Sequence, residues 1–178
     1  MTTVEILAQR NADFAAHRFS RGLHLMPSLK TLILGCADPR VDPAQIFGLD
    51  LGDAVVVRNL GGRVNPGTLQ TLSLLGMIGR AMGGVPGDDW NLVVLHHTDC
   101  GITRLAGFPD QLADHLGIPA DELDAKAVDD PWTSVAVDVA LLKRTPSMPP
   151  DMVVSGFVYD VATGLVEQVV APAPLRER

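Results

Sequence analysis

The stretch Lys30-Thr-Leu-Ile-Leu-Gly35 is a short apolar run, and the polar segment Cys36-Ala-Asp-Pro-Arg40 follows it directly. A run of this length, bounded upstream by Pro27, predicts a strand that is buried on both faces. Two segments of the same kind follow at 53–58 (DAVVVR) and 91–96 (NLVVLH). Strands buried on both faces are typical of parallel sheets covered by helices, so these runs indicate an α/β protein.

Helical patterns alternate with these strands. Apolar spacing and helix-start residues predict helices over 3–19, 66–82 and 131–144, a short helix after Asp42-Pro43, and smaller helical pieces over 108–130. Near the end, residues 153–160 and 165–170 flank Val161-Ala-Thr-Gly164, which predicts a hairpin. The expected fold is a mostly parallel central sheet flanked by helices, with a C-terminal antiparallel hairpin and an N-terminal helical arm, in one domain over 1–178.

Length, composition and charge narrow the class of protein. The chain has 178 residues, 47% of them hydrophobic, and a formal net charge of −7 without a run of Lys or Arg. Nucleic acid and anionic membranes are therefore poor candidates as partners. The longest apolar stretch, Leu72 to Gly84, is interrupted by Arg80 and is too short to span a bilayer. Charged residues occupy the N-terminal segment where a secretory signal needs an apolar core, so we expect a cytoplasmic protein.

The chain has two cysteines, and both lie at predicted strand ends. Cys36 follows the first strand, while His97 and Cys100 follow the third. Because the carboxyl ends of parallel strands meet at one edge of a sheet, we expect these three side chains to converge. Two thiolates and one imidazole suit zinc, and three protein ligands leave the open position of a catalytic site. Taken alone, the His-x-x-Cys spacing fits a core histidine and a buried thiol better, and a disulfide is the other alternative.

Three motifs carry a resemblance to a known family. The segments CADPR (36–40), VVVRNLGGRV (55–64) and VVLHHTDCGI (93–102) are similar to those of the β-class carbonic anhydrases, and the C-terminal hairpin is a weaker match. The resemblance implies a zinc enzyme that reversibly hydrates CO2 to bicarbonate by means of zinc-bound hydroxide. It implies Cys36, His97 and Cys100 as zinc ligands, with Asp38 and Arg40 as a catalytic dyad. It also implies a homodimer or higher homo-oligomer in which the N-terminal helix packs on the partner.

The charge of the expected site shows why a dyad is needed. Two thiolates cancel the charge of Zn²⁺, so this zinc is a weaker Lewis acid than one held by three neutral histidines. Arg40 can hold Asp38 as a carboxylate, and Asp38 can orient the nucleophile. The resemblance allows Asp38 to become a fourth zinc ligand in a closed state. Pro39 departs from the small residue usual between Asp and Arg, and we expect it to restrict the dyad geometry.

The remaining expectations concern the surroundings of the metal. Apolar or glycine positions near strand ends are candidates for contacting uncharged substrate; these are Val56, Leu60, Gly61, Gly62 and Val64. Strand alternation predicts a structural, hydrogen-bonded His96, and Asp99 fits a turn or cap better than a partner of the site. His17, His24 and His115 are expected at the surface.

Two alternative functions use the same residues. Carbonyl sulfide and carbon disulfide are also linear, uncharged and electrophilic, so a hydrolase acting on them needs the same zinc site. A non-catalytic zinc-binding or bicarbonate-sensing protein would keep the metal without the dyad chemistry. The presence of Asp38 and Arg40 weighs against this second alternative.

Overall fold

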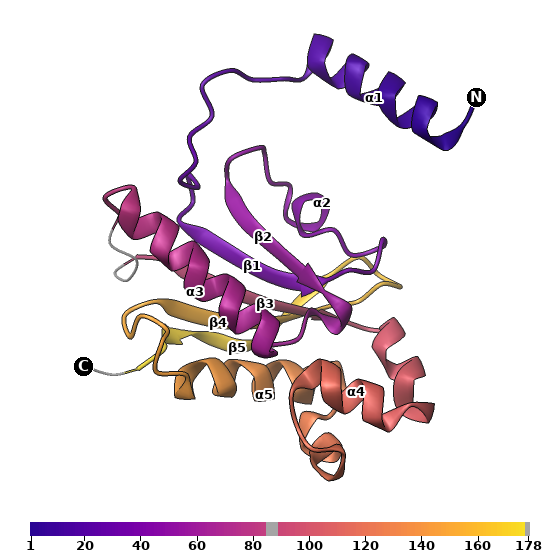
Figure 1. Cartoon of the computed structure of the whole chain (residues 1–178), viewed down its shortest axis with the longest axis vertical. Coiled ribbons are helices and arrows are strands. Elements are labelled where there is room, and N and C mark those ends of the chain that lie inside the picture. Colours follow the sequence, from indigo (N-terminus) through magenta and orange to yellow (C-terminus); the bar gives the residue numbers. More distant parts are fainter. Residues whose placement is uncertain (85–88, 177–178) are drawn as a thin grey trace.

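The computed structural model describes residues 1–84 and 89–176 (Figure 1). Its helices are α1 (Thr3–His17), α2 (Pro43–Phe47), α3 (Pro66–Ala81), α4 (Pro109–Leu116) and α5 (Pro131–Arg144), with short 3₁₀ helices η1 (Leu60–Gly62), η2 (Gly101–Gly107) and η3 (Ala120–Lys126). Its strands are β1 (Thr31–Cys36), β2 (Ala54–Asn59), β3 (Asn91–His97), β4 (Val153–Tyr159) and β5 (Val166–Pro174).

The strands form one sheet in the order β2-β1-β3-β4-β5. The pairs β1–β2, β1–β3 and β3–β4 are parallel, and β5 is antiparallel to β4. This confirms the predicted mixed sheet with its C-terminal hairpin. β5 continues to Pro174, past the predicted end at 170, because it pairs with β4 over the whole length of that strand.

Helices cover both faces of the sheet. Alternate residues of β1, β3 and β4 pack with α3 and α5 in the main core, which includes Leu34, Val94, Val154, Leu72 and Val139. The ring of Phe47, at the end of α2, meets Phe157 of β4 edge to face. Since Phe157 alternates with the core residue Val158, α2 lies on the other face. The parallel strands are thus sandwiched, as their continuous apolar sequences predict.

Three helices begin with the same signal, an Asp or Asn followed by proline. The side chains of Asp42, Asn65 and Asp130 each accept a backbone hydrogen bond from the first turn of α2, α3 and α5. The proline after each cap has no N–H, and that position needs no donor. This signal explains why the starts of these helices could be located from the sequence.

The N-terminal helix stands apart from the rest of the chain (Figure 1). α1 has a capping box between Thr2 and Glu5 but no buried residue. Val4 and Leu7 are 75% and 58% exposed. A helix that buries none of its apolar side chains gains no packing energy within this chain.

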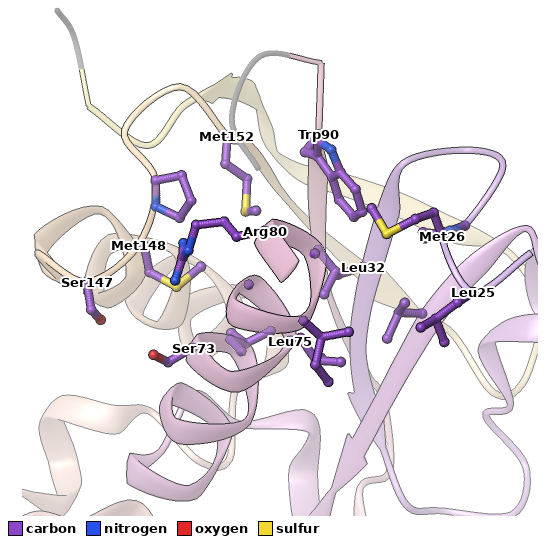
Figure 2. A pocket seen from close by; sticks show the side chains of 17 residues that line it. Leu25, Met26, Leu32, Ser73, Leu75, Arg80, Trp90, Ser147, Met148 and Met152 are labelled. Atoms are coloured by element: carbon purple, nitrogen blue, oxygen red, sulfur yellow. The ribbon is translucent and has the colours of Figure 1, made fainter. Parts of the chain in front are cut away.

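An apolar cavity of about 130 Å³ lies at the amino ends of the parallel strands (Figure 2). Its lining includes Leu25, Met26, Leu32, Trp90 and Met152. Cys36 and His97 are at the carboxyl ends of their strands, so this cavity lies at the opposite ends of the strands from them. Among the described helices, none is both long and apolar enough to cross a membrane.

Candidate metal centre

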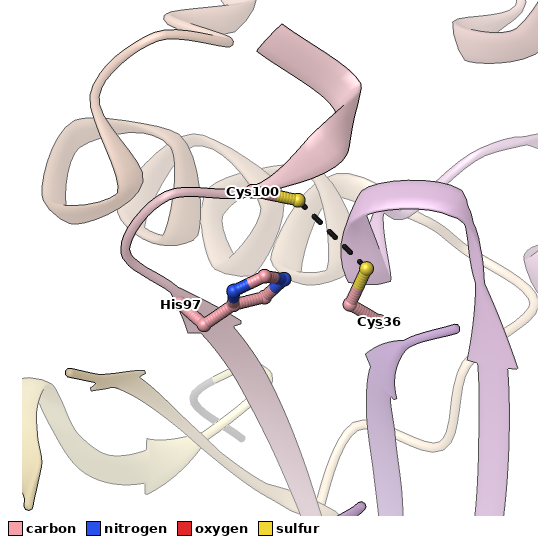
Figure 3. A group of neighbouring side chains, drawn as sticks. All are labelled: Cys36, His97 and Cys100. Carbon is pink, nitrogen blue, oxygen red and sulfur yellow. Dashed lines mark hydrogen bonds between the residues drawn. The ribbon is translucent and has the colours of Figure 1, made fainter. Parts of the chain in front are cut away.

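The structure brings Cys36, His97 and Cys100 together at one edge of the sheet (Figure 3). Cys36 and His97 are the last residues of β1 and β3, because each strand ends one residue later than predicted, and Cys100 is the N-cap of η2. All three are buried, and their candidate ligand atoms lie within 4.8 Å of one another. The convergence predicted from strand ends is therefore confirmed.

The geometry of the three ligand atoms fits a tetrahedral zinc ion. The two Sγ atoms are 3.8 Å apart, so both cysteines are free rather than joined in a disulfide. A tetrahedron with Zn–S bonds of about 2.3 Å has an edge of about 3.8 Å. His97 Nδ1 donates to the carbonyl oxygen of Thr98 at 2.8 Å. That bond leaves Nε2 as a buried acceptor without a partner, which is the state of a histidine prepared for a metal.

Backbone donors also stabilise the thiolate of Cys36. The N–H groups of Asp38 and Gly61 donate to Cys36 Sγ at 3.4 Å and 3.3 Å. The hydrogen bond with Cys100, supported by the neighbouring His97 ring and these two backbone groups, outweighs burial and holds the pKa of Cys36 well below its ordinary value. The pKa of Cys100 is raised, because a second anion beside the Cys36 thiolate is unfavourable. Without a cation, the pair therefore holds one negative charge, and a cation favours loss of the second proton.

Asp38 and Arg40 form a two-point ion pair within a tight turn. Arg40 Nη2 donates to Asp38 Oδ2 at 2.7 Å, and Arg40 Nε donates to Oδ1 at 3.0 Å. The backbone N–H of Val41 donates to the Asp38 carbonyl at 3.1 Å, so Pro39 occupies the second position of a β-turn. Proline presets the backbone angle that this position requires. Pro39 therefore helps to form the dyad geometry, and hydrogen bonding to Arg40 lowers the pKa of Asp38 to about 2.

Arg40 also joins the two ligand-bearing segments. Its Nη1 donates to Asp99 Oδ2 at 2.8 Å, and its Nη2 donates to the Asp99 carbonyl at 2.9 Å. Asp99 has φ 50° and forms the turn between His97 and Cys100. Asp99 is thus both the predicted turn residue and a partner of the dyad, the role that the sequence favoured less.

The closed arrangement with Asp38 as a ligand is not the one that the structure adopts. Both carboxylate oxygens of Asp38 are bonded to Arg40, and Asp38 does not belong to the cluster of candidate ligand atoms. In this arrangement Arg40 holds Asp38 outside the three-residue cluster.

The residues expected to contact substrate differ in their burial and in their position relative to the cluster. Val64 is fully buried in the main core, whereas Val56 and Leu60 are 37% and 39% exposed. A small cavity of about 40 Å³ lies beside the cluster. Of the five residues expected to contact substrate, Gly61 is the one that lines it. Other residues of its lining include His97, Cys100 and Thr103. Val64 therefore packs in the core. A contribution to substrate binding stays a prediction for Val56, Leu60, Gly61 and Gly62.

The histidines outside the cluster behave largely as expected. His96 is buried with Nδ1 2.7 Å from Ser134 Oγ, which confirms a structural, hydrogen-bonded role. His17 and His24 are exposed. His115 is also exposed, but its Nε2 donates to the Leu60 carbonyl at 2.9 Å, a contact that the sequence did not predict.

Sequence reasoning missed a buried ion pair beside the site. Arg63 and Asp138 are each 1% exposed, and Arg63 Nε donates to Asp138 Oδ2 at 2.8 Å. Each residue interrupts an apolar or glycine-rich segment, Arg63 in LGGRV and Asp138 in VAVDVALL. Charged residues are almost never fully buried unless they are paired, so two such interruptions were the available signal.

The fold and the cluster define an α/β protein with three side chains that could hold a metal ion at the carboxyl ends of its parallel strands. The sequence model of the carbonic anhydrase family matches residues 31–124. β-Carbonic anhydrase 1 of Mycobacterium tuberculosis is 29% identical over 95% of this chain and 99% of its own. The crystal structure of carbonic anhydrase from Streptococcus mutans has a TM-score of 0.72 at 34% identity, covering 95% of this chain and 98% of that one. The chain belongs to the β-class carbonic anhydrase family.

Membership in this family indicates a carbonate dehydratase, a lyase. Some relatives carry another activity in their names. The carbon disulfide hydrolase of Saccharolobus solfataricus is 27% identical, over 87% of this chain and 83% of its own.

Proposed function

We propose that this protein is a zinc-dependent carbonic anhydrase that interconverts CO2 and bicarbonate. The observation that carries the proposal is the buried cluster of Cys36, His97 and Cys100, whose Sγ–Sγ distance of 3.8 Å and partnerless His97 Nε2 fit tetrahedral zinc. When bound with an open position, zinc acidifies water and so supplies a nucleophile for attack on carbon dioxide.

Side chains near the cluster are placed to orient the attacking water. The two-point contact with Arg40 keeps Asp38 ionised and fixes its carboxylate plane, and Arg40 is itself held by Asp99. Asp38 can then accept a hydrogen bond from the attacking water and direct its lone pair toward the substrate carbon. Hydrogen bonds from the N–H groups of Asp38 and Gly61 to Cys36 Sγ withdraw electron density from the thiolate. That withdrawal partly offsets the weak Lewis acidity of a metal bound by two thiolates.

The test of catalysis is the variant Asp38→Ala. We expect it to retain one zinc per chain and to lose hydration activity on the order of 100-fold, because the nucleophile is no longer oriented. Zinc is measured by elemental analysis and hydration by stopped flow, with Asp110→Ala on α4 as a matched control. An unchanged rate with a full zinc site would identify a non-catalytic zinc protein.

A second candidate is hydrolysis of carbon disulfide or carbonyl sulfide at the same site. The similarity to the carbon disulfide hydrolase of Saccharolobus solfataricus favours it over unrelated reactions. Release of hydrogen sulfide from either substrate, compared with CO2 hydration by the same zinc-loaded sample, separates the two candidates.

The proposal extends to assembly and location. The unburied α1, with Val4 and Leu7 exposed, supports a homodimer or higher homo-oligomer in which this helix packs on another copy of the chain. Two free, buried cysteines fit a reducing compartment, so we place the protein in the cytoplasm.

A further inference from the structure

The buried ion pair between Arg63 and Asp138 has more contacts than a simple pair. Asp138, in the middle of α5, accepts from Arg63 Nε at 2.8 Å and from the backbone N–H of Val64 at 2.9 Å. Arg63 Nη2 adds a longer bond to Asp138 at 3.2 Å and donates to the Lys126 carbonyl at 3.0 Å. The carboxylate thus holds both a side chain and the main chain of the segment 63–64.

Burying two charges is costly. Removing a carboxylate and a guanidinium from water costs several kcal/mol per ion, and an apolar pair of similar volume is often at least as stable. The pair is therefore weak evidence for stability and better evidence that this segment has to adopt one defined position.

The segment held by Asp138 directly follows the turn η1. Gly61 and Gly62 in this turn have φ 79° and 64°, in the left-handed region. A Cβ atom on Gly62 would lie 3.0 Å from the Cys36 nitrogen, the Gly35 carbonyl carbon and the Leu95 carbonyl oxygen. The turn is therefore pressed against the backbones of β1 and β3 at their carboxyl ends.

Both ends of the turn are fixed by side chains. Before it, Asn59 Oδ1 accepts from the Arg63 N–H at 2.8 Å, and Asn59 Nδ2 donates to the Arg63 carbonyl at 2.7 Å. After it, Asp138 holds Arg63 and Val64. Between these anchors, the N–H of Gly61 donates to Cys36 Sγ at 3.3 Å.

We propose that Asp138 is a positioning residue for the metal centre: with Arg63 it anchors the turn η1 so that the Gly61 N–H stays bonded to the Cys36 thiolate. The inference rests on the proposed function, since it assumes that this thiolate is a metal ligand. Asp138 acts from α5, far from the cluster in sequence, and touches none of the three ligands in the described structure. Groups that orient a ligand in this way typically change metal affinity or activity by about 10–100-fold when removed.

The test compares two double variants, neither of which leaves a single charge buried. Arg63→Met with Asp138→Leu removes both anchors, whereas Arg63→Met with Asp138→Asn keeps an oxygen that can accept from the Val64 N–H. Each protein is loaded with cobalt(II), whose thiolate charge-transfer band reports the electron density on the cysteine sulfurs. Val139→Ala, the neighbouring core position on α5, is the control for a general loss of stability.

We expect the Leu-containing double variant to shift the band to lower energy and to bind cobalt(II) about 10–100-fold more weakly. The Asn-containing variant should lie between it and the wild type, and Val139→Ala should melt earlier with an unshifted band. Identical bands and affinities in all four proteins would overturn the inference. A wild-type protein without any thiolate–cobalt band would instead overturn the proposed metal centre, so the two failures are distinguishable.

Discussion

Arg40 is the residue whose contacts are most informative about the metal centre. It holds both oxygens of Asp38 and also binds the side chain and carbonyl of Asp99. It therefore joins the segment that carries Cys36 to the turn that carries His97 and Cys100. One guanidinium can do this because its planar fork offers several donors in fixed directions.

The variant Arg40→Ala should close the site. Hydrogen bonding to Arg40 lowers the pKa of Asp38 to about 2, and without it the pKa should return toward about 3.9. Asp38 would still be a carboxylate at neutral pH, but it would be free to bind the metal. A crystal structure of the zinc-loaded variant should show an Asp38 oxygen about 2.0–2.2 Å from zinc.

The control for this prediction is Arg104→Ala. Arg104 is 80% exposed and touches Asp99 at 3.4 Å without reaching Asp38. Its removal should leave the zinc site open. If Asp38 stayed away from zinc in Arg40→Ala at both low and high pH, the closed state would have no support in this protein.

At the residue scale, the convergence of the two cysteines and His97 could be predicted, whereas the pairing of the two buried charges could not. Cys36, His97 and Cys100 follow apolar runs, so their strand ends and their chemistry point to the same place. The Arg63–Asp138 pair joins residues 75 positions apart, and only the packing of α5 on the sheet brings them together. No periodic pattern encodes such a contact.

Among the elements, the turn η1 brings its main chain into contact with Cys36 of the three-residue cluster. Gly62 and Gly22 both have positive φ, at 64° and 80°. A Cβ on Gly22 would meet nothing within 4 Å, whereas one on Gly62 would meet three backbone atoms at 3.0 Å. A substitution at Gly22 therefore tests backbone strain alone, whereas one at Gly62 tests backbone strain together with steric crowding.

We expect Gly22→Ala to lower the free energy of unfolding by about 1–2 kcal/mol, the cost of a left-handed alanine. Gly62→Ala should lower it by more and should also weaken zinc binding, because the turn must move away from Cys36. Urea unfolding and zinc competition with a chelator measure the two effects. Equal losses of stability with equal zinc affinity would show that the turn is not tightly packed against β1.

The elements also show where sequence patterns are informative. The starts of α2, α3 and α5 were predictable because a cap and a proline mark each of them. The turn η2 was not predicted, since 3₁₀ helices lack a repeating apolar face long enough to recognise. In the sequence, Gly61 and Gly62 were candidates for contacting substrate, and their left-handed turn was not predicted because the residues that anchor it lie on other elements.

At the scale of the whole molecule, the proposed homo-oligomer rests on the unburied helix α1. Val4 and Leu7 are exposed on a helix that has no buried residue. If α1 packs on another copy, Val4→Asp combined with Leu7→Asp should convert the assembly to monomers, as measured by analytical ultracentrifugation. Gln9→Asp combined with Asn11→Asp adds the same charge without removing an apolar group, and it should stay assembled. An unchanged mass in the first variant would exclude α1 as the essential contact.

The proposed function depends on whether the Cys36–His97–Cys100 centre with zinc hydrates carbon dioxide. The most direct measurement is stopped-flow CO2 hydration by the protein with one zinc per chain, alongside hydrogen sulfide release from carbon disulfide. We predict hydration far above the uncatalysed rate and its loss in Cys100→Ser together with the metal. Hydration at the uncatalysed rate with the zinc site full would contradict the account, and rapid sulfide release in the same sample would assign the site to the other substrate.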